Sequence, residues 1–138
     1  MKHQIATTPE QSKRLLACGV DPNTADMSHE PYGMPQEQPT LSVGSPFLVG
    51  ATHAWSLSAL LELLPTSLTS AMGNEYMLEL SKLRMHNAWE IQWYNGRERW
   101  RTKDKDKKYH KLWDESPIEA CVKAIEWLTA NGYTLNTK

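Results

Sequence analysis

The sequence predicts an α+β fold: a three- to four-stranded antiparallel meander packed against a C-terminal helix, with two short N-terminal helices and a long Pro-rich loop. Large apolar residues recur at every second position over residues 76–81 and 89–94, which is typical of half-buried strands. Residues 116–131 instead carry apolar side chains at helical spacing. A chain of 138 residues is long enough for one domain with its own core, so residues 1–138 are interpreted as a single domain.

The first short helix is predicted from the spacing of its capping residues. Thr8 precedes Pro9, and Gln11 follows Thr8 by three positions. This spacing indicates a capping box, in which the Thr8 hydroxyl and the Gln11 amide each accept a backbone N–H of the first turn. Gly19 predicts that the helix ends near Cys18, since glycine readily adopts the left-handed conformation that closes a helix.

Prolines and glycines are concentrated in the next segment. Residues 20–54 contain five of the eight prolines and three of the seven glycines. Because proline lacks a backbone N–H and fixes φ, this density predicts that neither a helix nor a central strand forms there. We therefore expect an irregular, flexible or wrapping loop over residues 28–54. Residues 47–49 are expected to form a short edge strand or to pin the loop to the core.

A second short helix is predicted between Ser56, which caps it, and Pro65, which ends it. Leu57, Leu60 and Leu64 recur on one face of this helix. About two turns of helix are marginal in isolation, so tertiary packing must hold the element in place.

The strand at residues 89–94 is followed by a strong turn signal. The Asn95-Gly96 pair favours a type I′ hairpin turn, which needs positive φ at both central residues. The register that follows from this turn pairs Ile91 with Trp100 and Glu90 with Arg101. Ile91 and Trp100 then belong to the apolar face of the sheet.

The C-terminal helix is predicted to begin with a capping box formed by Ser116 and Glu119 and to end at Asn131-Gly132. Residues 109–113, just before it, are expected to add a fourth strand to the meander. The apolar stripe of the helix is expected to cover the apolar face of the sheet, with Trp127 at the rim of the stripe.

Three stretches of the chain carry a resemblance. They are residues 19–27 (GVDPNTADM), 55–65 (WSLSALLELLP) and 116–128 (SPIEACVKAIEWL). In this order they resemble a group of small uncharacterised proteins encoded in prophages and mobile elements of gut bacteria. That group has no assigned activity, so the resemblance implies an origin and a compartment but no functional residues.

Composition argues for a cytoplasmic protein without membrane association. A net charge of -1 gives no general attraction to polyanions or membranes. The N-terminal residues lack the apolar region of a secretory signal, and the longest apolar stretch, residues 57–64, is interrupted by Ser58 and Glu62. Cys18 and Cys121 lie among apolar neighbours, as reduced buried thiols do, although a disulfide between them stays open.

The sequence carries no pattern of a catalytic, cofactor-binding or metal-binding site. Its five histidines are scattered, and it lacks both a G-x-S-x-G elbow and a glycine-rich phosphate loop. Asp21, Asp26, His29 and Glu30 are the nearest approach to a metal-ligand cluster, but a turn explains Asp21 equally well. We therefore predict no catalytic residue, metal or cofactor, with an enzyme whose site is spread through the chain as an alternative.

Residues 97–111 are the clearest charge feature, because eight basic residues against three acidic ones give this segment a net charge of +5 and the remainder -6. Basic stripes with interleaved aromatic residues are typical of nucleic-acid binders. A solvated hairpin edge, charged to prevent sheet-to-sheet association, explains the same residues. The nucleic-acid-binding candidates are Arg97, Arg99, Arg101, Lys103, Lys105, Lys107, Lys108 and Lys111.

The expected function is a non-enzymatic, cytoplasmic protein-interaction module of phage origin that binds an unspecified protein partner. This hypothesis rests on the missing catalytic motifs and on a long loop carried by a small scaffold. A nucleic-acid-binding module that uses residues 97–111 is the alternative. Trp113 and Trp127 are candidates for an interaction surface, because the other four tryptophans are assigned to the sheet or to a helix start.

Overall fold

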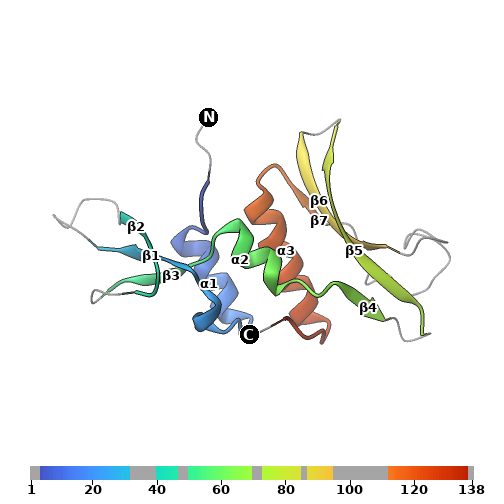
Figure 1. Cartoon of the computed structure of the whole chain (residues 1–138), viewed down its shortest axis with the longest axis horizontal. Helices are drawn as coiled ribbons and strands as arrows, with labels where there is room; N and C mark the ends of the chain where they lie inside the picture. The colour runs from blue at the N-terminus through green and yellow to red at the C-terminus, as the bar shows by residue number, and fades with distance from the viewer. Residues whose placement is uncertain are drawn as a thin grey trace.

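A computed structural model describes residues 4–31, 40–46, 50–69, 73–84, 87–94 and 112–136. Figure 1 shows a central group of helices with one antiparallel sheet on each side of it. The predicted α+β class is therefore confirmed. The elements, in chain order, are α1 (Pro9–Ala17), η1 (Pro22–Thr24), β1 (Met27–Glu30), β2 (Thr40–Val43), β3 (Thr52–Ala54), α2 (Leu57–Leu63), β4 (Ser67–Thr69), β5 (Glu75–Leu83), β6 (Ala88–Tyr94), β7 (Leu112–Asp114) and α3 (Pro117–Ala130).

The first sheet lies where the sequence predicts an irregular loop. Its strand order is β2-β1-β3, with β1 paired antiparallel on both sides. The prediction that residues 20–54 contain no central strand is therefore wrong. The physical reason is the position of the prolines: Pro22 begins η1, and Pro31 and Pro46 follow β1 and β2, so none of these three prolines interrupts a described strand. Residues 47–49 lie outside the described residues.

The second sheet is an antiparallel meander with strand order β4-β5-β6-β7, in which β5, β6 and β7 lie at or near predicted strands and β4 was not predicted. The predicted partners of β6 are wrong, however. Ile91 lies between Leu80 of β5 and Leu112 of β7, so both of its edges are occupied and Trp100 is not its partner. Glu90 likewise lies between a residue of β5 and one of β7. The Asn95-Gly96 pair and residues 97–111 lie outside the described residues.

Helix α3 packs against β6 and β7, as predicted. Its N-cap Ser116 accepts the backbone N–H of Glu119 at 3.2 Å, and Tyr133 N donates to Leu128 O at 2.9 Å beyond its C-terminal end. The helix buries one stripe against the sheet and the other helices, and this stripe consists of Ile118, Ala120, Cys121, Val122, Ala124, Ile125 and Leu128. The core of the molecule thus centres on α3.

Helices α1 and α2 both pack against α3, and α1 also packs against β3 of the first sheet. Thr8 and Gln11 form the predicted capping box at the start of α1. Arg14 of α1 reaches α3, where its guanidinium donates to Glu119 at 2.8 and 3.0 Å and to Glu126 at 2.6 and 3.0 Å. These hydrogen bonds, from Glu126 first and then Glu119, raise the pKa of Arg14. Among the described residues, no helix has the length and apolarity that crossing a membrane requires.

Candidate binding groove

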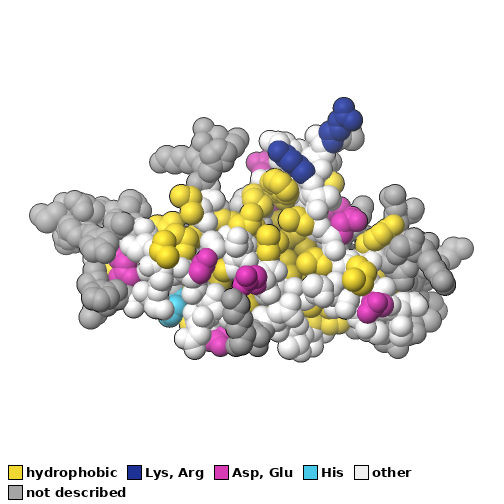
Figure 2. Space-filling model, viewed as in Figure 1, with side chains coloured by type: hydrophobic (Ala, Val, Ile, Leu, Met, Phe, Trp, Pro, Cys, Tyr) yellow, Lys and Arg dark blue, Asp and Glu magenta, His cyan; other side chains and the backbone are white. Residues whose placement is uncertain are grey.

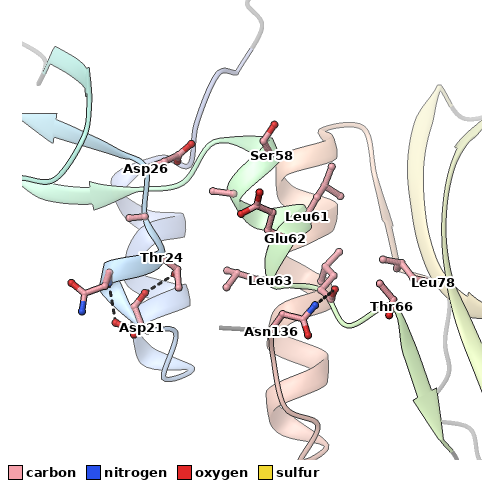
Figure 3. A pocket seen from close by; sticks show the side chains of 14 residues that line it. Asp21, Thr24, Asp26, Ser58, Leu61, Glu62, Leu63, Thr66, Leu78 and Asn136 are labelled. Carbon is pink, nitrogen blue, oxygen red and sulfur yellow. Dashed lines mark hydrogen bonds between the residues drawn. The ribbon is translucent and has the colours of Figure 1, made fainter. Parts of the chain in front are cut away.

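A groove with a cavity volume of about 720 Å³ opens on the face of the molecule shown in Figure 3. Three groups of residues line it. The first is the segment 21–26, which contains η1; the second is the outer face of α2; the third comprises Thr66, Leu78 and Asn136. Residues far apart in the sequence therefore meet here.

The first wall is held rigidly by local hydrogen bonds and by the core. Asp21 caps η1 by accepting Asn23 N at 2.9 Å, and its carbonyl accepts the Thr24 hydroxyl at 2.6 Å. Thr24 Oγ1 in turn accepts the indole N–H of Trp55 at 2.9 Å. Because Trp55 is fully buried, this contact ties the wall of the groove to the core.

Asp26 joins the first wall to the second. Its carboxylate accepts Ser56 N at 2.8 Å and also the Ser56 hydroxyl. Ser56 is itself the N-cap of α2 and accepts Ala59 N at 3.2 Å. The Asp26 carboxylate therefore links segment 21–26 to the N-terminal end of α2.

The second wall is the solvent face of α2. Ala59, Leu60 and Leu63 anchor the helix in the core. Ser58 and Glu62, one helical turn apart, are exposed and line the groove, as Figure 3 shows. This polar pair makes α2 amphipathic and supplies the groove with a carboxylate.

The C-terminal end of α2 is completed by distant parts of the chain. Three successive carbonyl groups accept hydrogen bonds there: Leu63 O from Asn136 N at 2.9 Å, Leu64 O from Asn136 Nδ2 at 3.0 Å, and Pro65 O from Trp93 Nε1 at 2.9 Å. Carbonyls at the end of a helix have no partner within the helix. Asn136 therefore satisfies two of them while lining the groove.

The charge of the groove has one sign. Asp21, Asp26 and Glu62 line it, whereas the described lining residues include no Lys, Arg or His. Figure 2 shows apolar side chains gathered over the centre of this face, with acidic side chains among and around them. The lining of the groove thus combines carboxylates with apolar side chains that include Leu61 and Leu78.

The four residues of the suspected metal cluster are used separately. Asp21 caps η1, and Asp26 binds Ser56. His29 Nε2 contacts Thr7 O at 2.6 Å, and Glu30 accepts the Ser28 hydroxyl at 2.7 Å in the first sheet. Within the described ranges, no group of three or more His, Cys, Asp or Glu side chains is arranged to hold a metal ion.

The two tryptophans predicted to mark a surface differ. Trp113 on β7 is 50% exposed. Trp127 is half-buried and stacks on both Trp93 and Tyr133, with 5.8 Å between ring centroids in each pair. Trp127 therefore has a packing role that its place at the rim of the helical stripe does not reveal. Neither residue lines the groove.

The basic candidates cannot be placed in the same way. Arg97, Arg99, Arg101, Lys103, Lys105, Lys107, Lys108 and Lys111 all lie outside the described residues.

The two cysteines have different surroundings. Cys121 is fully buried in α3, and burial raises the pKa of its thiol from 9.0 to about 12. This thiol stays protonated near neutral pH, where a nucleophile needs the thiolate. Cys18 is half-buried, and both cysteines are free rather than joined in a disulfide.

The groove was not predicted, although the sequence contains one signal for it. Glu62 was interpreted only as an interruption of an apolar stretch, and Asp21 as a turn residue or a member of the suspected metal cluster. The four-residue spacing of Ser58 and Glu62 within a leucine-rich helix marks a solvent-facing stripe beside the core. What lies opposite that stripe depends on the tertiary fold.

Comparisons of the chain with protein-family profiles, with curated proteins and with solved structures gave no match.

Proposed function

We propose that this protein is a non-enzymatic protein-interaction module, and that its groove receives a short segment of a partner protein. The observation that carries the proposal is the groove itself, whose lining includes apolar side chains and whose segment 21–26 is linked to Trp55 and Ser56 by hydrogen bonds. Pre-formed walls favour binding, because little conformational entropy is lost when the segment enters.

The groove suits a peptide segment by size and composition. Its volume of about 720 Å³ falls within the usual range of ligand sites, roughly 300–1,000 Å³. Side chains of a bound segment would cover Leu61 and Leu78, which are only partly buried. The polar lining residues of the groove would hydrogen-bond to the backbone and the polar side chains of the same segment.

A groove-filling variant tests this proposal. Peptides are selected from a random 12-residue display library against the full-length protein, and their dissociation constants are measured by fluorescence anisotropy. Ser58→Trp, on the exposed face of α2, should weaken the selected peptides at least tenfold because the indole occupies the groove. Ala17→Trp, exposed at the end of α1, is the matched control and should leave affinity unchanged. Peptides that bind both variants alike would place binding elsewhere and refute the proposal.

Nucleic-acid binding through residues 97–111 is the second candidate, supported by the net charge of +5 in that segment. The acidic groove repels phosphates, so this function would use a separate surface. Anisotropy titrations with single- and double-stranded oligonucleotides at low salt test it. Flat titrations at high micromolar protein would exclude it, since phosphate contacts are strongest at low salt. The predicted cytoplasmic location and phage origin stay predictions.

A further inference from the structure

We propose that one edge of β5 binds an extended segment of a partner protein, which adds to the second sheet as a further strand. The inference goes beyond the proposed function, because this edge is a surface separate from the groove. The observation that carries it is the difference in length between two paired strands. Strand β5 comprises residues 75–83, whereas β4 pairs only with residues 75–77, at one end of β5 (Figure 1).

The backbone groups of this edge have a definite direction. In antiparallel sheets, successive residues direct their N–H and C=O groups alternately to the two neighbouring strands. Leu78 N donates to Thr66 O at 2.9 Å, on the β4 side of β5. The register with β6 continues without interruption to the end of β5, so Leu80 and Lys82 direct their groups to the same side as Leu78. No described strand pairs with residues 79–83 on that side.

Two common protections of a strand edge do not apply here. Native proteins keep outer strands short or place lysine side chains along the open edge. The other outer strands that the structure describes, β2, β3, β4 and β7, have only three or four residues. Lys82 Nζ lies 5.5 Å from the centroid of the Trp89 ring of β6, so this side chain is directed back across the sheet and does not shield the edge.

The side chains along the edge indicate the composition of the added strand. Leu80 and Lys82 share the face of β5 that carries the buried Tyr76. Leu80 is 38% exposed, although its register partner Ile91 is fully buried. An apolar side chain opposite Leu80 would cover this exposed area, and a carboxylate opposite Lys82 would complement its charge. We therefore expect a segment in which apolar and acidic residues follow each other at every second position.

The probe is a fluorescein-labelled nine-residue peptide of the sequence Val-Thr-Glu-Thr-Val-Thr-Glu-Thr-Val, and its affinity for the full-length protein is measured by anisotropy. Two derivatives carry backbone N-methyl groups, one on the Val and Glu residues and the other on the Thr residues. Only alternate N–H groups of an added strand point at β5. One derivative should therefore bind at least tenfold more weakly than the parent peptide, and the other should keep its affinity. Equal binding by the two derivatives would overturn the inference.

A proline variant of the protein tests the same hydrogen bonds from the other strand. Lys82→Pro removes a backbone N–H that points away from β6, so the pairing of β5 with β6 is kept while the peptide should bind at least tenfold more weakly. Thr69→Pro is the matched control, because the same alternation directs the N–H of this exposed β4 residue away from β5, and it should leave affinity unchanged. Thermal unfolding of both variants verifies the fold.

A charge reversal tests the side-chain part of the inference. The wild type should prefer the Glu-containing peptide about two- to fivefold over a counterpart with Lys in place of both Glu residues. Lys82→Glu keeps the backbone N–H and should reverse this preference, a gain that misfolding cannot produce. A preference that survives the reversal would show that the acidic side chains do not face Lys82 and would overturn this part.

Three further outcomes would overturn the inference. If Ser58→Trp weakens the peptide and Lys82→Pro does not, the peptide occupies the groove, and the proposed function stands without this inference. If sedimentation shows a dimer that Lys82→Pro converts to a monomer, a second copy of the chain occupies the edge instead of a partner protein. If the peptide does not bind at high micromolar protein, the edge does not accept a strand.

Discussion

The two sheets of this protein are stabilised by different interactions. In the sheet β4–β7 the largest buried side chains are apolar, among them Tyr76, Ile91 and Trp93, although Glu90 and Gln92 of β6 are buried as well. In the sheet β1–β3 the most buried side chains of the central strand are Ser28, fully buried, and Glu30, 2% exposed, which are hydrogen-bonded to each other. The meander depends chiefly on removing apolar area from water, and the first sheet depends on satisfying polar groups.

The difference extends to the neighbouring N-terminal segment. Thr7 is fully buried, and its hydroxyl accepts Trp55 N at 3.0 Å and contacts the Ser12 hydroxyl at 2.8 Å. Directional contacts of this kind specify one geometry, whereas apolar packing tolerates adjustment. Thr24 in the groove wall at residues 21–26 is hydrogen-bonded to Trp55, the residue whose backbone N–H binds Thr7. The wall is therefore tied to the part of the molecule where directional contacts fix the geometry.

The largest effect is expected in the apolar sheet. Trp93→Ala removes a fully buried ring that stacks on Trp127 and donates to Pro65 O, so it should lower the free energy of unfolding by about 3–5 kcal/mol. Trp113→Ala, on the same sheet but half exposed, should cost about 1 kcal/mol. Urea denaturation measures both. Equal losses would mean that burial does not dominate this sheet.

The hydrogen-bonded region should respond to the loss of one oxygen atom. Thr7→Val keeps the shape but leaves Trp55 N and the Ser12 hydroxyl without this partner, and we expect a loss of about 1–3 kcal/mol in unfolding free energy. Thr69→Val, on an exposed position of β4, should be close to neutral. If Thr7→Val left the free energy of unfolding unchanged, hydrogen bonding would not distinguish the N-terminal part of the molecule from the β4–β7 sheet.

Alkaline pH offers a probe of the apolar core. The Cys121 thiol has its pKa raised by burial from 9.0 to about 12, so above pH 9 it ionises in the unfolded chain before it does so in the folded one. The buried, protonated thiol therefore contributes fully to the free energy of unfolding below pH 9. This contribution is lost between pH 9 and 12, by at most about 1.4 kcal/mol per pH unit. When the free energy of unfolding is measured by denaturation between pH 8 and 10, it should fall less steeply with pH in Cys121→Ala than in the wild type.

The smallest effect is expected where the two regions join. Arg14→Met removes the ion pairs between α1 and α3, but the side chain is 37% exposed, so the expected loss is about 1 kcal/mol. The difference from the wild type should shrink in 1 M NaCl, because salt screens exposed charges. Lys13→Met, exposed on the same helix, is the control. A loss as large as that of Trp93→Ala would make this junction the principal contact.

Much of the meander side was predictable because local patterns indicate its elements, although β6 also buries the polar side chains of Glu90 and Gln92. The apolar stripe of α3 and the alternation of Trp89, Ile91 and Trp93 each indicate the element that forms. The partners of β6 were not predictable in the same way. An Asn-Gly turn is a local signal, whereas the edges of Ile91 are occupied by strands that arrive from both directions along the chain.

The first sheet was missed because its pattern contradicts the usual rule. Ser28 and Glu30 are more deeply buried than Met27 and His29, so polarity along β1 does not indicate which face is covered. Strands of three and four residues also give too short a pattern to outweigh the prolines around them. The groove was hidden for a related reason, because it joins residues 21–26 to residues from three later parts of the chain.

The contacts of Asn136 with the end of α2 also bear on folding kinetics. Helix α2 has seven residues, too few to persist alone, and the hydrogen bond from Asn136 to Leu64 spans 72 positions of the sequence. Contacts of such large sequence separation form only at the entropic cost of closing the intervening loop. Although α2 looks like a local element, we expect its amides to gain full protection only once the C-terminal segment with Asn136 has docked on it.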